Sequence, residues 1–494
     1  MTEDFIPFEA KNDTFIQWLR QNDIQTHPAV KIVDLRHQAR GRGIIATQSI
    51  PIDTELFSIP RSALLTPAAL PAPIIASATS DDEPLDPWTG LLLALIHEQT
   101  HPNSRWQPYL DLLPTESDFD TPMFWSPAEL AELQSSAVRS KIGREDAEDM
   151  FKTRILPVIR THASAFGLSH LLEDQLAEEV IRRAHVAAST IMAYAFDVEP
   201  TGQRTVDEEG YVSDESDAEL PKAMVPLADL LNADADRNNA KLFYEADGTL
   251  VMRAVKDIAA GEEVFNDYGA LSRGELLRRY GYVTERYAQY DVVEIPVECF
   301  LASARTLCRV PEQGLREKLE RIYGEDEIPD GVVMANEDLE LFTVEKMYEL
   351  FELFPIFQLE SMLEGPNTQA GNTGPQDQEL DTLLARHDGP ARDIRLLFVF
   401  VLRALDSALS SYGTTYEQDA QKLEQLQQRN QPDQQTRRIA MAIAVRMGEK
   451  KLLKQVVKKL HNMWQEAAQI GAQSVQELLD SSKRQRKRRK QESS

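Results

Sequence analysis

Strand-like segments occur in two separate parts of the chain, 41–60 and 240–269, and a long helical pattern lies between them. From about 86 to 196, apolar residues recur at three- and four-residue spacing, which is typical of amphipathic helices. Beyond about residue 300 the pattern is again mainly helical. The sequence therefore predicts the order β, helical insertion, β and helical C-terminal domain, without an internal repeat.

Turn residues delimit the individual strands. In the first β part, "IIAT" and "ELFSI" flank a turn at Pro51 and Asp53 and predict a β-hairpin. In the second, "AKLFYEADGTLVMRAV" has an Asp247-Gly248 turn between two strand-like runs, which predicts another hairpin. The run "EEVFNDYG" at 262–269 predicts a further short strand, and "LSRGELLRRYG" after it is expected to be helical.

These patterns divide the chain into consecutive parts. They are an N-terminal helical segment (1–29), a first β part (30–66), a helical insertion (67–220) ending in an acidic loop (207–220), a second β part (221–290), a helical domain (300–480) with a polar linker (364–379), and a basic tail (481–494). The long helices expected near the C-terminal end can pack internally or pair with another chain, and we expect a monomer.

Length and composition indicate a globular chain of about two or three domains, because 494 residues exceed the usual capacity of one core. The longest apolar run, Gly90–Ile96, is far shorter than the ~20 residues that cross a bilayer. The start of the chain has no signal-peptide pattern, and Cys299 and Cys308 are the only cysteines, so we expect a reducing, intracellular compartment. We expect no metal site, because no Cys or His cluster accompanies them.

Charge is unevenly distributed along the chain. The formal net charge is -27, yet "KRQRKRRK" at 483–490 carries seven positive charges. An acidic body favours basic substrates over nucleic acid, although solubility alone also explains it. The basic tail is typical of a nuclear-import signal or of a nucleic-acid contact, and its place in a low-complexity end favours the first.

Signatures of the common hydrolases, kinases and dinucleotide enzymes are absent from the sequence: there is no Gly-x-Ser-x-Gly, phosphate loop, His-Glu-x-x-His or helix-opening Gly-x-Gly-x-x-Gly. Three other elements stand out. They are "QARGRGIIA" at 38–46, "PLADLLNADADRNNA" at 226–240, and "FNDYGALSRGELLRRYGYV" at 265–283 with its two Tyr-Gly sites. Each is weak alone, and together they are specific.

The order of these elements resembles that of SET-domain lysine methyltransferases. The helical insertion, with "SRWQPYLDLLP" at 104–114 and "PMFW" at 122–125, and the helical C-terminal domain are similar to the Rubisco large-subunit methyltransferase-like branch. "LADLLNAD" and "ELLRRYGYV" look most like the fungal enzymes that methylate a large-subunit ribosomal protein. The resemblance implies an α+β fold: a SET domain of small β-sheets with a helical insertion, plus an all-α C-terminal substrate-binding domain.

Methyl transfer to lysine from S-adenosylmethionine, the cofactor that the resemblance implies, needs an in-line path between sulfonium and amine. It also needs a neutral amine, and deprotonating an ordinary lysine at pH 7 costs roughly 4.6 kcal/mol. A narrow, dry channel with tyrosine walls and backbone carbonyls disfavours the ammonium and orients the lone pair.

The tyrosines of the two Tyr-Gly sites resemble those that form this channel in the family. By the resemblance, Tyr268 is the catalytic tyrosine at the methyl-transfer pore. Tyr280 closes the lysine channel and touches the cofactor, and Tyr282 packs on the adenine. One strand end and the helix after it would then supply two walls of one channel. The alternative is that Tyr280 and Tyr282 are ordinary core aromatics.

The glycine-containing motif near the start is the first expected part of the cofactor site. Family matching assigns Arg40, Gly41 and Arg42 to cofactor binding, and Gly41 and Gly43 would let the backbone approach a ligand closely. A simple turn before a strand is the alternative.

The second expected part is the "LADLLNAD" motif. In the family an Asn-His pair holds the methionine part of the cofactor, whereas this chain has Asn232 and Ala233, which keeps the amide and the backbone but removes the imidazole. Asp229 would lie where cofactor and substrate meet, or would act only as a helix cap or turn residue.

On the substrate side, the resemblance implies that Tyr194, Phe196 and Tyr244, together with Tyr280, line the lysine cleft, with core packing as the alternative. The function expected is a protein-lysine N-methyltransferase acting on a basic ribosomal protein, without direct nucleic-acid or membrane binding. We expect it in the nucleus, with cytoplasmic modification equally compatible. The alternatives are methylation of lysine or histidine in a histone or transcription factor, and a catalytically silent SET-fold peptide-binding module.

Overall fold

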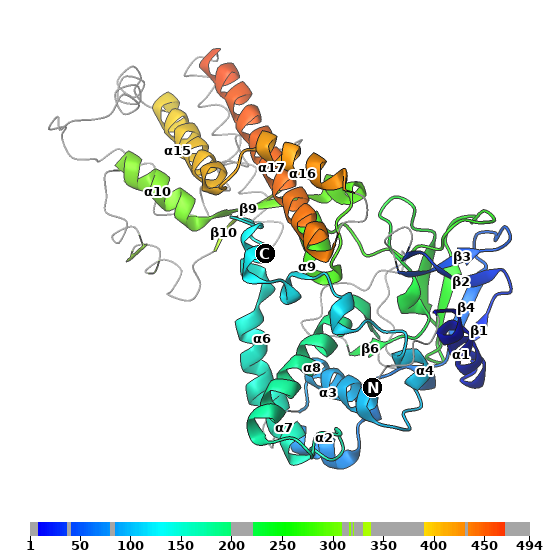
Figure 1. Cartoon of the computed structure of the whole chain (residues 1–494). Coiled ribbons are helices and arrows are strands. Elements are labelled where there is room, and N and C mark those ends of the chain that lie inside the picture. Colours follow the sequence, from blue (N-terminus) through cyan, green and yellow to red (C-terminus); the bar gives the residue numbers. More distant parts are fainter. Residues whose placement is uncertain are drawn as a thin grey trace, which may run out of the picture. The chain divides into compact units, whose positions relative to one another are not determined.

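The computed structural model describes residues 8–36, 41–79, 84–198, 221–308, 330–336, 390–429 and 433–469, with the single positions 316, 317 and 320. The chain divides into two compact units. The first comprises Met1–Trp125, Ser140–Leu271 and Glu275–Tyr282, and the second comprises Ser126–Arg139, Ser272–Gly274 and Val283–Ser494. Figure 1 labels their helices and strands.

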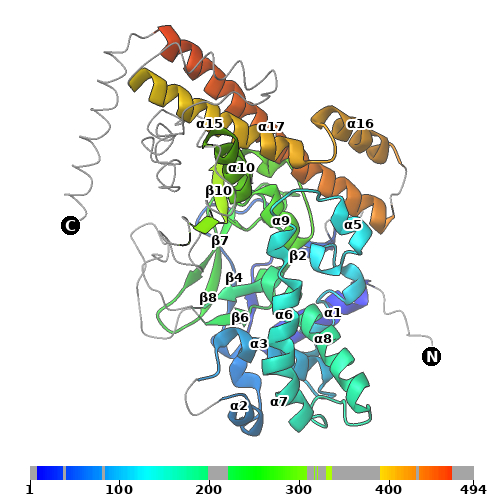
Figure 2. The ribbon, with the colours of Figure 1, turned by 90° about the vertical axis from the view of Figure 1, so that its left-hand side faces the viewer.

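Small antiparallel sheets form the β part of the first unit. One sheet has the strand order β1 (Gln25–Thr26), β4 (Glu55–Ile59), β8 (Leu250–Ala254) and β7 (Ala240–Tyr244); the others pair β2 (Val30–Asp34) with β3 (Arg42–Ala46) and β5 (Ala195–Asp197) with β6 (Lys222–Met224). Figure 2 shows β4 and β8 side by side, so strands from the two β parts of the sequence share a sheet across the helical insertion.

The hairpin predicted for 41–60 is wrong, because its two strands belong to different sheets. β3 pairs with β2, whereas β4 lies between β1 and β8. The segment between β3 and β4 does not close on itself, since Ile50 forms a two-bond bridge with Ile258 in the second β part. Long-range pairing thus replaces the local turn.

The hairpin predicted for 240–255 is confirmed. β7 and β8 pair in register around the Asp247-Gly248 turn, and Gly248 has a φ of +85°. The strand predicted for 262–269 is wrong: this segment makes only single bridges, Ile45 with Glu263 and Ala233 with Asn266.

Helices cover the sheets of the first unit. They are α1 (Phe8–Gln21), α2 (Ala72–Ala78), α3 (Pro87–Thr100), α4 (Gln107–Leu110), α6 (Arg144–Met150), α7 (Leu156–Thr161) and α8 (Glu173–Tyr194), with a π-turn at Phe151–Ile155. α3 begins with Asp86, whose carboxylate accepts a hydrogen bond from the Thr89 N–H at 2.8 Å. Its residues from Leu91 to Ile96 are fully buried, and α8 packs against it (Figures 1 and 2). None of the helices described here is long and apolar enough to span a membrane.

The second unit is mainly helical and contains one two-stranded sheet. Its elements are α5 (Pro127–Ala131), β9 (Val292–Pro296), α10 (Val297–Cys308), β10 (Gly331–Ala335), α15 (Pro390–Ser411), α16 (Tyr416–Gln427) and α17 (Gln434–Gln469); α9 (Arg273–Tyr280) begins here and ends in the first unit. The core includes Phe300, Phe400 and Leu453 and the buried free thiol of Cys299. The acidic loop 207–220, the linker 364–379 and the basic tail lie outside the described residues.

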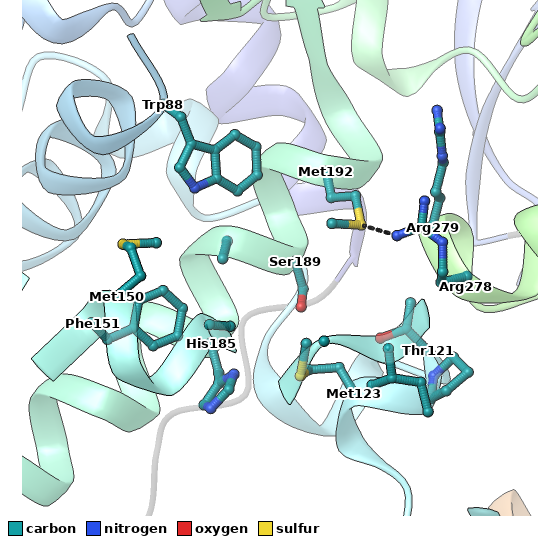
Figure 3. Close-up of a pocket in the computed structure, with 15 residues that line it drawn as sticks. Trp88, Thr121, Met123, Met150, Phe151, His185, Ser189, Met192, Arg278 and Arg279 are labelled. Carbon is teal, nitrogen blue, oxygen red and sulfur yellow. Dashed lines mark hydrogen bonds between the residues drawn. The ribbon is translucent and has the colours of Figure 1, made fainter. Parts of the chain in front are cut away.

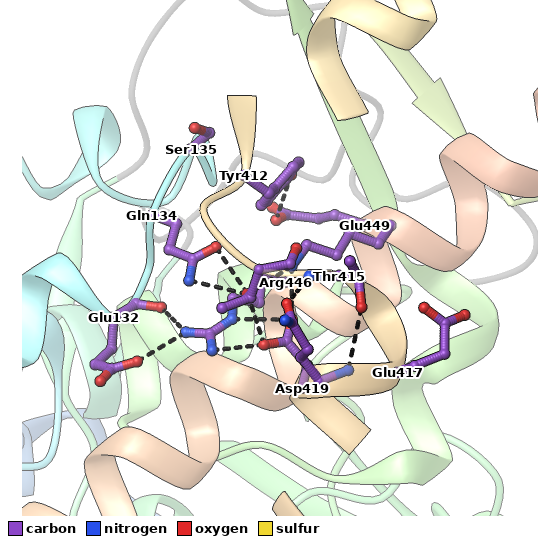
Figure 4. Close-up of polar contacts among 12 residues, drawn as sticks. Glu132, Gln134, Ser135, Tyr412, Thr415, Glu417, Asp419, Arg446 and Glu449 are labelled. Carbon is purple, nitrogen blue, oxygen red and sulfur yellow. Dashed lines mark hydrogen bonds and ion pairs between the residues drawn. The ribbon is translucent and has the colours of Figure 1, made fainter. Parts of the chain in front are cut away.

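The unit boundary differs from the predicted insertion 67–220, because Ser126–Arg139 belongs to the second unit. A buried polar network explains this (Figure 4). The Asp419 carboxylate contacts Arg446 at 2.7 Å and Lys450 at 2.6 Å, and Arg446 also pairs with Glu132 at 3.0 Å. Glu132 thereby ties the inserted segment to α16 and α17.

Burial and ion pairing act in opposite directions on Asp419, whose side chain is 0% exposed. Burial raises the pKa of this carboxyl, but hydrogen bonds from Arg446, Lys450 and Thr414 outweigh it and leave the pKa lowered. The carboxylate is therefore charged at neutral pH, and its two cationic partners depend on it.

We expect Asp419→Asn to lower the free energy of unfolding of the second unit by about 3–5 kcal/mol, because it leaves two buried cations without their shared anion. Glu417→Gln, in the same helix as Asp419, is the matched control: it removes an exposed ion pair with Lys454 of α17 and should change nothing measurable. Urea unfolding followed by circular dichroism checks both. Equal stabilities for the two variants would show that the network does not hold the unit together.

Candidate functional site

A backbone crossing joins two motifs that are far apart in the sequence. Ala233 pairs with Asn266 in a parallel bridge, and the Asn266 N–H donates to the Asn232 carbonyl at 2.9 Å. The buried side chain of Asn239 reinforces the crossing, since its amide accepts from the Phe265 N–H at 2.8 Å. "LNAD" and "FNDYG" therefore lie side by side in the first unit.

The three tyrosines of the two Tyr-Gly sites come together beside this crossing. The rings of Tyr268 and Tyr280 stack with centroids 4.3 Å apart and planes 11° apart, and Tyr282 lies 6.4 Å from Tyr280 at 58°. The Tyr268 hydroxyl donates to the Leu231 carbonyl at 3.3 Å. All three side chains are half-buried, unlike ordinary core aromatics, and their expected proximity is confirmed.

Gly281 makes the Tyr-Gly-Tyr turn possible. Its φ is +73°, a region that favours glycine, and a Cβ there would lie 2.8 Å from the Thr121 nitrogen and 2.9 Å from the Asp120 carbonyl carbon. The turn at the end of α9 thus packs directly on the insertion backbone.

Asn232 is held by two hydrogen bonds from its amide nitrogen. Nδ2 donates to the Arg42 carbonyl at 3.1 Å and to Glu263 Oε1 at 2.8 Å. Gly43 leaves room for these side chains, because a Cβ there would overlap Leu35 Cδ1 and lie 2.9 Å from Glu263 Oε1 and 3.1 Å from Asn232 Nδ2, so a larger residue would displace them. The close approach at Gly43 is therefore to the chain's own side chains. Sequence reasoning missed Glu263, which has no motif signal of its own.

The motif "QARGRGIIA" contributes mainly backbone groups to the candidate site. Arg40 lies outside the described residues, and Gly41 has a φ of +67°. The Arg42 guanidinium points to other partners, donating to Asn12 Oδ1 at 3.1 Å and to the Leu112 carbonyl at 3.3 Å. Arg42 thus meets the site through its carbonyl oxygen.

Asp229 forms a buried pair with a tyrosine from the insertion. The Tyr109 hydroxyl in α4 donates to Asp229 Oδ2 at 2.5 Å, and Oδ1 is buried without a hydrogen bond from any described residue. Burial raises the pKa of the Asp229 carboxyl to about 7 in spite of the bond from Tyr109. Burial, followed by the charge of Asp229, raises the pKa of Tyr194 to about 12, which places Tyr194 close to this pair. Sequence reasoning did not single out Tyr109.

The residues expected on the substrate side lie around β5. Tyr194 ends α8, Phe196 is in β5, and the Tyr244 hydroxyl in β7 donates to the Asp197 carbonyl next to Phe196. All three rings pack against the core of the unit and are partly exposed. Among the residues that the structure describes, no group of three His, Cys, Asp or Glu side chains is arranged to hold a metal ion.

Two models of known protein families match parts of this chain. The family model of the SET domain matches residues 41–269, and that of Rubisco LSMT substrate-binding matches residues 360–453. The chain thus contains a region similar to the SET domain. Its SET match contains both crossing segments, and the substrate-binding match lies in the second unit.

Several relatives share part of this SET-domain chain. Ribosomal lysine N-methyltransferase 4 of Saccharomyces cerevisiae is 34% identical over 306 residues, which are 59% of this chain and 59% of that protein. The protein of the same name from Schizosaccharomyces pombe is 25% identical over 58% of this chain and 70% of its own length, and mouse N-lysine methyltransferase SETD6 is 31% identical over 54% and 53%. The match thus spans little more than half the length of the S. cerevisiae and mouse proteins.

Solved structures share the fold over nearly the whole chain. Rubisco LSMT bound to sinefungin and monomethyllysine has a TM-score of 0.61 at 21% identity, covering 95% of each chain. Rubisco LSMT bound to AdoMet has a TM-score of 0.59 at 20% identity, covering 95% of this chain and 96% of that one. The expected fold class, a SET domain with a helical insertion and a helical substrate-binding domain, is confirmed.

The raised pKa of Asp229 makes a pH dependence testable. The folded carboxyl keeps its proton up to about pH 7, whereas the unfolded one loses it near pH 4, so the free energy of unfolding falls as pH rises between these values. We expect the wild type to lose about 4 kcal/mol relative to Asp229→Asn between pH 4 and 7, with no further change above. Urea unfolding of both proteins at a series of pH values measures the difference. Parallel curves would contradict a protonated Asp229.

Proposed function

We propose that this SET-domain chain is an S-adenosylmethionine-dependent protein-lysine N-methyltransferase. The observation that carries the proposal is the stacked Tyr268–Tyr280 pair beside the crossing of "LNAD" and "FNDYG". These elements supply one stacked aromatic wall, a hydroxyl and backbone carbonyls at one place. The relatives named lysine methyltransferases in yeasts and mouse support the same activity.

The residues present fit the cofactor. Asn232 Nδ2 donates hydrogen bonds to two acceptors, which fix the orientation of the side-chain amide. Its Oδ1 accepts no hydrogen bond from the described part of the chain and can therefore accept one from the α-ammonium group of the cofactor. Asn232, the backbone of Ala233 and Arg42, and the ring of Tyr282 would hold the cofactor. When bound, S-adenosylmethionine supplies an electrophilic methyl group on a sulfonium.

The chain's own groups would prepare the lysine. The stacked rings of Tyr268 and Tyr280 exclude water from one side of the amine, which disfavours the ammonium form. The Tyr268 hydroxyl donates to the Leu231 carbonyl, and its oxygen would act as an acceptor for the methyl group in transfer. Tyr194, Phe196 and Tyr244 would line the path of the lysine stem. The proton leaves to water before transfer.

The proposed substrate is a basic protein of the large ribosomal subunit. The names of the two yeast relatives support this choice, and the net charge of -27 favours a basic partner. The helical second unit would hold the protein substrate, as its Rubisco LSMT substrate-binding match suggests. We propose that the chain acts as a monomer and does not bind nucleic acid directly; a mass near 55.8 kDa by light scattering would support the first point.

The proposal is tested by incubating the wild type and Tyr268→Phe with radiolabelled S-adenosylmethionine and ribosomal subunits from cells that lack this protein. We expect label on one ribosomal lysine, located by mass spectrometry, and a loss of about 100-fold or more in kcat for the variant. Its stability should change by less than about 1.5 kcal/mol, because the hydrogen bond from the Tyr268 hydroxyl to the Leu231 carbonyl is long, at 3.3 Å. Tyr290→Phe, a half-buried tyrosine in the second unit, is the control and should keep full activity.

The outcomes separate chemistry from substrate. Label on histones but not on ribosomal protein would keep lysine methylation and discard the ribosomal target, and label on histidine would discard lysine. No binding of S-adenosylmethionine, or undiminished activity of Tyr268→Phe, would overturn the enzymatic proposal and favour a SET-fold module that binds peptide without catalysis.

We propose further that the basic segment 483–490 directs the chain to the nucleus, where ribosomal proteins gather before assembly. Its seven positive charges in eight residues support this. Replacing the basic residues with Gln in a fluorescent fusion should move the protein to the cytoplasm. An unchanged distribution would discard the import signal without touching the methyltransferase proposal.

A further inference from the structure

A pocket lies in the first unit, apart from the residues assigned to methyl transfer. It encloses about 140 Å³ between α6, α8, the end of α9 and the turn after Asp120 (Figure 3). This is close to the ~150 Å³ of an engineered cavity that binds benzene. Met192, which lines it, is 39% exposed, so the pocket is open to solvent on that side.

The lining is largely apolar and rich in groups that suit an aromatic ring. Trp88 and Phe151 contribute aromatic faces, and Met123, Met150 and Met192 contribute thioethers. Sulfur atoms near a ring edge make favourable contacts, and flexible methionine side chains adapt to the shape of a ligand.

Two polar side chains in this lining are buried without hydrogen bonds. Thr121 is 3% exposed and its hydroxyl has no partner, and His185 is 9% exposed with no hydrogen bond at either ring nitrogen. The Glu148 carboxylate lies 3.5 Å from Nε2, and the charges of Arg144 and Glu116 also act on the pKa of the ring. Buried polar groups in native proteins are nearly always paired, so two such groups lining one pocket indicate a ligand that pairs them.

The two buried polar groups of this pocket are uncharged at neutral pH. Burial lowers the pKa of His185 against the opposing effect of Glu148, so the ring is neutral at neutral pH and offers one donor and one acceptor. Arg278 and Arg279 also line the pocket and both pair with Glu275, at 2.8 Å and 3.0 Å, so these three side chains together keep one positive charge and the lining does not favour a cationic ligand.

We infer that this pocket binds a neutral, hydroxyl-bearing aromatic molecule of about the size of phenol. Its ring lies among the methionine, Trp88 and Phe151 side chains, and its hydroxyl pairs with both Thr121 and His185, as donor to one and acceptor from the other. Binding requires no methyl transfer and does not depend on the proposed function. α8 and α9 run from the pocket into the candidate site, since Met192 is two residues before Tyr194 and Arg279 directly precedes Tyr280.

Methyl NMR of the full chain with ¹³C-methyl-labelled methionine tests this inference with phenol as the probe. Ring currents should shift the signals of Met123, Met150 and Met192 in a saturable way, while methionines outside the pocket stay unchanged. Assignment follows from single Met→Leu variants. No saturable shift at millimolar phenol, or equal shifts at other methionines, would overturn the inference.

A matched ligand and a matched variant test recognition of the hydroxyl. Toluene has the size of phenol but offers no hydrogen bond, so it should bind about fivefold more weakly. Thr121→Val exchanges an unpaired hydroxyl for a methyl group, which should leave stability unchanged or raised, yet weaken phenol about fivefold and leave toluene unaffected. Equal affinities for the two ligands in the wild type would overturn the choice of a hydroxyl-bearing ligand.

Filling the pocket tests its location. Ala188→Leu places a larger side chain in the lining and should abolish the phenol shifts. Ala177→Leu, at another half-buried alanine of α8 outside the pocket, should leave them intact. Unchanged phenol binding by Ala188→Leu would show that the ligand binds elsewhere.

Discussion

The pairing of Ala233 with Asn266 is the contact on which the candidate site depends. It joins a segment that follows the helical insertion to one that leads into α9, and Asn232, Leu231 and Tyr268 take their positions from it. The bonds are between backbone groups, so side-chain identity at Ala233 matters little to the crossing itself. This explains how the chain has alanine where the family motif has histidine while the arrangement around Asn232 is intact.

Buried polar groups have different surroundings in the two units. In the second unit, the Asp419 carboxylate pairs with Arg446 and Lys450, so these buried charges have partners. Such a network stabilises one arrangement of the helices over others. In the first unit, Asp229 Oδ1, Thr121 and His185 keep unpaired polar atoms. Such atoms cost stability unless something pairs with them, and all three lie at or beside a place where the structure can receive a ligand.

Local patterns succeeded where local interactions decide the structure. The Asp247-Gly248 turn specifies the β7–β8 hairpin because glycine meets the φ that the turn requires. The helical segment expected near the N-terminus contains α1, which buries Phe15, Trp18 and Leu19 on one face. The hairpin at 41–60 failed because β4 pairs with β1, about 30 residues before it, and with β8, about 190 residues after it. Strand propensity carries no information about which strand will be the neighbour.

The sequence by itself determined the SET architecture and most of the candidate site, because the motif residues Tyr268, Tyr280 and Asn232 lie in short, ordered signatures whose spacing is readable. Only the tertiary structure decided the supporting groups: Glu263 beneath Asn232, Tyr109 against Asp229, and the unpaired Thr121 and His185 in a pocket. It also assigned Ser126–Arg139 to the second unit. The physical reason is that burial and hydrogen-bond partnership are properties of residues that meet across long stretches of chain, and no local pattern encodes such meetings.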